Sequence, residues 1–141
     1  MHPLRRRGET RDGPGLIDAK DTIMKYLLLI ASDPTLPSPE PGDEGFDAYM
    51  GAWTQYTQDM IDAGAYGGGE ALQGVETATT VRHEAGATTI VDGPFAELKE
   101  HLGGYYVVDV DTLDDALDWA KKLPVGTGAV EVRPIFPTDG F

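Results

Sequence analysis

The sequence predicts one α+β domain with the order strand, helix, strand, strand, helix, strand, and a β-hairpin inserted after the second strand. Three observations predict it: an apolar run of strand length near residue 25, two segments with apolar residues at helical spacing, and two β-branched runs joined by a short turn containing glycine. A chain of 141 residues with 40% hydrophobic content suits a single compact core.

The predicted strands differ in pattern. The segment from Lys25 to Ile30 is continuously apolar after its lysine, which is typical of a strand covered on both faces. The main sheet is completed by the Gly-rich segment 65–72 and by segments 105–110 and 130–135. Segments 77–83 and 88–92, joined by residues 84–87, form the predicted hairpin.

Two amphipathic helices are predicted. The first ends before Gly64, and its apolar side recurs at Phe46, Tyr49, Met50, Trp53, Thr57, Met60 and Ile61. The second begins at Thr112, which stands three residues before Asp115 in a capping-box pattern, and ends at Leu123-Pro124. Its inner face carries Leu113, Ala116, Leu117 and Ala120. Two helices cover one face of such a sheet, so the other face needs a partner and a homodimer is expected.

Charge and composition narrow the class of partner. The net charge is −13, and residues 24–141 alone carry six basic and twenty acidic side chains. This balance disfavours nucleic acid and anionic membrane as partners. There is no cysteine, hence no disulfide or thiolate chemistry, and no apolar run reaches the ~18 residues that span a bilayer. The protein is expected to be cytoplasmic.

Residues 1–23 differ from the rest of the chain. They contain the cluster Arg5-Arg6-Arg7, several Gly and Pro residues and no apolar periodicity, and Met24 opens the first predicted strand. No apolar segment follows the arginines, which disfavours a secretion signal. These residues are expected to be a disordered extension or a start-site artefact. The alternative that assigns them a function is a basic arm that binds nucleic acid.

The corner between the hairpin and the next strand carries the most distinctive motif. Asp92-Gly93-Pro94-Phe95 is followed by Glu97, Lys99-Glu100 and Gly103-Gly104, and it is preceded by Gly68-Gly69-Glu70-Ala71-Leu72 and Met24-Lys25-Tyr26-Leu27-Leu28-Leu29-Ile30. This ordered set resembles the bacterial YCII-related proteins of the DGPF type, over about Met24 to Ile135. The resemblance assigns residues 24–141 to one such domain. It implies a ferredoxin-like fold that pairs into a dimeric α/β barrel with a cleft in each protomer.

The wider family also implies a mechanism that this chain lacks. Some members use a His-Asp pair, with the His in the first helix, for elimination without a cofactor. No histidine stands between Phe46 and Gly64 here, so that mechanism is not carried over.

Two carboxylates are the candidate general bases. Asp92 serves either as a base or as an Asx-turn residue whose carboxylate accepts backbone amides after Gly93. Glu70 follows three glycines, so the backbone beside it can approach a ligand closely. For both residues the structural and functional interpretations stay open.

The candidate ligand-binding residues come from several elements. Arg82 and Arg133 can clamp a carboxylate, or can form internal salt bridges instead. The resemblance favours a site role for Glu97, Lys99 and Glu100 over surface ion pairs. Tyr105 and Tyr106 face opposite sides of their strand, so only one of them, here Tyr106, is placed in a cleft. Glu97 and His101 would share a helix face, but two ligands do not make a metal site, and neither a metal nor a cofactor is expected.

Two functions from different classes follow. The first is a cofactor-free lyase or isomerase for a small aromatic or carboxylated metabolite, with Asp92 or Glu70 as base and Arg82, Lys99 or Arg133 stabilising an enolate-like anion. The second is a non-catalytic, dimeric binding or regulatory protein. The resemblance supports the second through the genomic association of the family with extracytoplasmic-function sigma factors.

Overall fold

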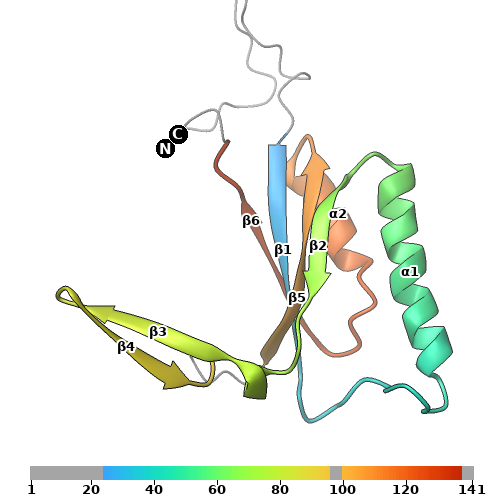
Figure 1. The fold of residues 1–141 in the computed structure, drawn as a ribbon. Coiled ribbons are helices and arrows are strands. Elements are labelled where there is room, and N and C mark those ends of the chain that lie inside the picture. Colours follow the sequence, from blue (N-terminus) through green and yellow to red (C-terminus); the bar gives the residue numbers. More distant parts are fainter. Residues whose placement is uncertain (1–23, 96–99, 138–141) are drawn as a thin grey trace, which may run out of the picture.

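The computed structural model describes residues 24–95 and 100–137. Eight main elements follow one another, with a short 3-10 helix, Val75–Thr77, between the second and third strands (Figure 1). They are β1 Met24–Ser32, α1 Phe46–Asp62, β2 Tyr66–Ala71, β3 Thr79–Glu84, β4 Ala87–Asp92, β5 His101–Val110, α2 Leu113–Lys121 and β6 Gly128–Pro134. The predicted N-terminal extension, residues 1–23, lies outside the described residues.

Four strands form one antiparallel sheet in the order β2-β5-β1-β6, and β3 and β4 form a second, two-stranded sheet. The two helices and antiparallel sheets make a mixed α+β structure that is compatible with a ferredoxin-like fold. β5 begins at His101 rather than at the predicted Tyr105, because pairing with β1 continues through a register shift near Ile30. His101 is therefore a strand residue, and the prediction that it shares a helix face with Glu97 is wrong for His101.

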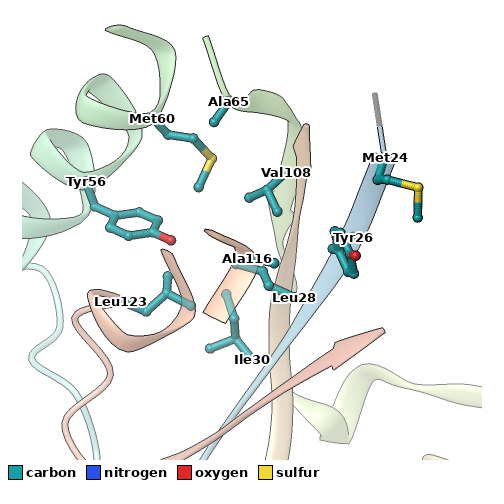
Figure 2. Packing of buried hydrophobic residues seen from close by; sticks show 10 residues of the cluster. All are labelled: Met24, Tyr26, Leu28, Ile30, Tyr56, Met60, Ala65, Val108, Ala116 and Leu123. Carbon is teal, nitrogen blue, oxygen red and sulfur yellow. The ribbon is translucent and has the colours of Figure 1, made fainter. Parts of the chain in front are cut away.

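Alternation along β1 and β5 gives the sheet two unlike faces. One face, called the helix face here, carries the side chains of Tyr26, Leu28, Ile30 and Val108, which are buried. Figure 2 shows Tyr56 and Met60 of α1 pointing toward this cluster, which also includes Ala116 of α2 and the following Leu123. Both helices therefore pack on the helix face.

The opposite face, called the outer face here, has no helix against it among the described elements. It carries Leu27, Leu29, Tyr105 and Val107, because Leu27 pairs with Val107 and Leu29 with Tyr105. All four residues are half-buried within this one chain. The outer face therefore presents an apolar centre.

Helix α1 confirms the predicted start at Phe46, and Gly64 follows its end with a φ of +73°. The predicted apolar side is shifted, however: Met50 and Ile61 are 43% and 47% exposed, whereas Tyr56 is buried. Tyr56 is drawn inward because its hydroxyl donates to the carbonyl of Trp119, 2.8 Å away, and its ring packs edge-on against Trp119. Burial, and secondarily the neighbouring Tyr106, raise the pKa of Tyr56, so the phenol keeps the proton that it donates.

Helix α2 confirms the predicted N-terminal cap. The Thr112 hydroxyl accepts a hydrogen bond from the Asp115 amide at 3.1 Å. We expect Thr112→Ala to lower the free energy of unfolding by about 1 kcal/mol, since it removes this cap. Urea titration followed by far-UV circular dichroism measures the change. Thr112→Ser keeps the acceptor and serves as the control; an equal loss in both variants would contradict a capping role.

The β3–β4 hairpin projects from the end of the main sheet where β2 ends and β5 begins (Figure 1). Its two-residue turn places Ala85 and Gly86 at φ +49° and +86°, as hairpin turns of the primed type require. Val81 pairs with Ile90, and these side chains are 52% and 73% exposed.

No helix of the described residues is long and apolar enough to cross a membrane.

Candidate ligand-binding cleft

A cavity of about 380 Å³ opens between α1 and the helix face of the sheet. Its floor is formed by β2 and β5, and one wall by Tyr49, Trp53 and Thr57 of α1. Two loops border one end, the loop after β1 with Ser38 and the loop before β6 with residues 124–126. The volume lies in the range of small-molecule sites.

Glycines on the helix face create this space. Gly69 of β2 pairs with Tyr106, and Gly104 of β5 pairs with Ile30, so both would point a side chain toward α1 if they had one. A Cβ on Gly69 would lie 2.7 Å from the carbonyl oxygen of Tyr105, and one on Gly104 would lie 2.8 Å from that of Glu70. Close backbone packing between β2 and β5 therefore disfavours a larger residue at these two positions of the cavity floor.

Aromatic rings form much of the cavity wall. Tyr49 and Trp53 stand edge-on at 6.4 Å between centroids, and Tyr66 and Tyr106 do so at 6.3 Å. Within the two pairs the rings are inclined at 72° and 74°. Such walls suit a ligand with a planar or apolar body.

A directed chain of hydrogen bonds runs along the wall. The Thr57 hydroxyl donates its single hydrogen to the carbonyl of Trp53, 3.0 Å away, one helical turn earlier. The Thr57 oxygen is also in hydrogen-bond contact with the Tyr106 hydroxyl. Because Thr57 has no second hydrogen, Tyr106 is the donor in that contact. The Tyr106 oxygen therefore keeps only lone pairs for the cavity.

The cavity contains little charge. Of the residues in 24–95 and 100–137 that border it, Glu70 alone has a charged side chain. Glu70 pairs with Tyr105, which pairs with Leu29 on the outer face, so alternation turns the Glu70 carboxylate away from the helix face. Apart from Glu70, whose carboxylate this alternation directs to the outer face, the described residues that line the cavity have uncharged side chains.

The other predicted acidic residues lie elsewhere. Asp92 is exposed at the end of β4, opposite Thr79 of the hairpin. Glu100 is half-buried just before β5 and does not border the cavity, while Glu97 lies outside the described residues. Among residues 24–95 and 100–137, no three His, Asp or Glu side chains gather closely enough to hold a metal ion.

The predicted basic residues are also away from the cavity. Arg82 lies on the hairpin, donates to the carbonyl of Phe95 at 3.2 Å and stacks over its ring at 5.2 Å. Arg133 belongs to β6, where it pairs with Leu27 on the outer face and lies 3.7 Å from Glu131. Lys99 lies outside the described residues. Of the predicted site residues in the described part of the chain, the structure brings the Tyr106 side chain and the Glu70 backbone to this cleft.

Two contributors were not identified from the sequence. Tyr66 precedes the Gly triplet at the start of an edge strand, and nothing in its spacing indicated a cavity. Thr57 was assigned to the apolar side of α1, although its place four residues after Trp53 also allowed the bond to the Trp53 carbonyl. Gly104 carried a usable signal, since a glycine in mid-strand often marks a close backbone approach.

The fold and the site together define the class of protein: an antiparallel α+β domain with a cleft under its first helix that is lined by aromatic side chains. The model of the YCII-related domain matches residues 24–139. The chain is also 37% identical over 115 residues to an uncharacterised protein of Rhizobium meliloti (strain 1021), covering 79% of this chain and 92% of that protein. The chain belongs to the YCII-related family.

Proposed function

We propose that this protein binds a small ligand with a planar, apolar body in the cleft under α1. The observation that carries the proposal is the 380 Å³ cavity itself, with its aromatic walls and bare glycine floor. We favour ligand binding over a reaction in which Glu70 is the general base. A general base must reach the proton that it removes, and the Glu70 carboxylate is turned to the outer face. Catalysis by Asp92 remains a prediction from the sequence.

The proposal includes a homodimer, with the hairpin as an insertion into a ferredoxin-like unit. Two copies would pair through the outer face to form a dimeric α/β barrel. The charge pattern is compatible with this face: Lys25 stands opposite Asp109 across the strands and Arg133 lies beside Glu131, so Glu70 is left as the one uncompensated charge among these residues. Elsewhere the protein is strongly acidic and two copies repel one another.

A cavity-filling variant tests the binding function. We expect a panel of small aromatic metabolites to contain a compound that raises the thermal midpoint of the wild type; at about 100 times its dissociation constant a ligand adds ~2.7 kcal/mol of stability. Ala71→Leu places a larger side chain at the cavity floor and should abolish the shift. Ala52→Leu, on the exposed side of α1, is the matched control and should keep it. A ligand shift that survives Ala71→Leu unchanged would refute binding in this cleft.

A further inference from the structure

We infer that the ligand of the cleft is an organic cation, an amine or ammonium group on a small aromatic or apolar body. This inference rests on the proposed binding function and specifies the chemical class of its ligand. The sequence leaves an aromatic or a carboxylated metabolite open, and the hydrogen bonds, rings and charges around the cavity favour an aromatic body that carries a positive charge.

The hydrogen-bond chain supplies the first reason. Tyr106 donates to Thr57 and Thr57 donates to the Trp53 carbonyl, so the Tyr106 oxygen can only accept from a ligand. An ammonium group has only donors and fits this acceptor. A carboxylate has only acceptors and would meet lone pairs at the Tyr106 oxygen.

The aromatic walls supply the second reason. Tyr49, Trp53, Tyr66 and Tyr106 border the space as two edge-on pairs, in which the two rings are inclined at 72° and 74°. The negative face of an aromatic ring attracts a cation, most strongly for tryptophan and when water is excluded. The rings thus replace part of the hydration that an ammonium group loses on entering.

The distribution of charge supplies the third reason. Among the described residues no basic side chain borders the cavity: Arg82 is bound to Phe95, Arg133 lies on the outer face beside Glu131, and Lys122 stacks over Trp119 at 4.8 Å. An anionic ligand would find no countercharge there. The net charge of −13 also attracts cations and repels anions over the whole surface.

Three matched probes test the inference by isothermal titration calorimetry at pH 7. They are 2-phenylethylamine, 2-phenylethanol and 3-phenylpropionate, which share a phenyl body and differ in charge. We expect the amine to bind at least about tenfold more tightly than the alcohol and the propionate most weakly. Raising the salt from 20 to 300 mM should weaken the amine severalfold and leave the alcohol almost unchanged, because salt screens charge.

Two variants place the effect at Tyr106. Tyr106→Phe should weaken the amine about three- to tenfold, whereas Tyr105→Phe changes the neighbouring tyrosine on the outer face and should not. Thr57→Val removes the acceptor of the Tyr106 hydrogen and frees it for a ligand, so the preference for amine over propionate should shrink. Circular dichroism and thermal midpoints establish whether each variant is folded. If Tyr106→Phe is not folded, Thr57→Val alone tests the role of the Tyr106 hydroxyl.

The outcomes separate this inference from the binding function beneath it. If the alcohol or the propionate binds as tightly as the amine and Ala71→Leu abolishes that binding, the cleft binds ligands and the cationic class is wrong. If the preference for amine is unchanged in both Tyr106→Phe and Thr57→Val, the role of Tyr106 is overturned. If none of the three probes binds, the inference fails, and failure of the metabolite panel as well would refute the binding function.

Discussion

Replacing Gly104 by alanine is expected to lower the free energy of unfolding by about 2 kcal/mol, within the range for overpacked sites. The new Cβ would lie 2.8 Å from the carbonyl oxygen of Glu70 and 3.3 Å from the Cα of Ala71. Both are backbone atoms of β2, so relief requires β2 to move away from β5 and weakens the pairing that forms the cleft floor. Chemical denaturation at a fixed protein concentration measures the loss.

The adjacent glycine provides the control. A Cβ on Gly103 would meet nothing within 4 Å, and its backbone is not in the left-handed region. We therefore expect Gly103→Ala to change stability by no more than ~0.5 kcal/mol. Equal losses in the two variants would mean that strand propensity, and not the contact with β2, explains the effect. If Gly104→Ala were as stable as the wild type, β2 would be able to move away from β5 at little cost, and the prediction would be wrong.

Much of the fold could be predicted because its signals are local. The periodicity of α1, the Thr112 cap and the β-branched hairpin strands each depend on residues close in sequence. The errors have tertiary causes. Tyr56 is buried because its hydroxyl finds the Trp119 carbonyl 63 residues away, and β5 starts at His101 because β1 supplies a partner for it.

The site was harder to predict than the fold. The sequence predicts a site among ionisable residues near the Asp92 motif, because charge is the usual sign of chemistry, yet Asp92 and Arg82 lie on the projecting hairpin. The cleft depends instead on two absent side chains, at Gly69 and Gly104, and on which face each strand residue occupies. Face assignment needs the register between β2, β5 and β1, which no local pattern of this chain specifies.

The same register leads to the second large prediction, which concerns the outer face. Leu29 lies at the centre of this face, with Tyr105 on one side and Glu131 on the other. If two copies pair here, Leu29→Asp would bury a carboxylate without a partner in each subunit, which costs several kcal/mol. We expect the variant to be a folded monomer, with a dimer dissociation constant raised by at least about a hundredfold, as measured by light scattering coupled to size exclusion.

Leu113→Asp is the matched control, because Leu113 is 47% exposed at the start of α2 and the same charge change there leaves the outer face intact. This variant should remain a dimer. Monomer formation by both variants would point to general charge repulsion, to which a protein of net charge −13 is already prone. A dimeric Leu29→Asp protein would exclude pairing through the outer face, and the apolar pair Val81 and Ile90 on the hairpin would then become the surface to test.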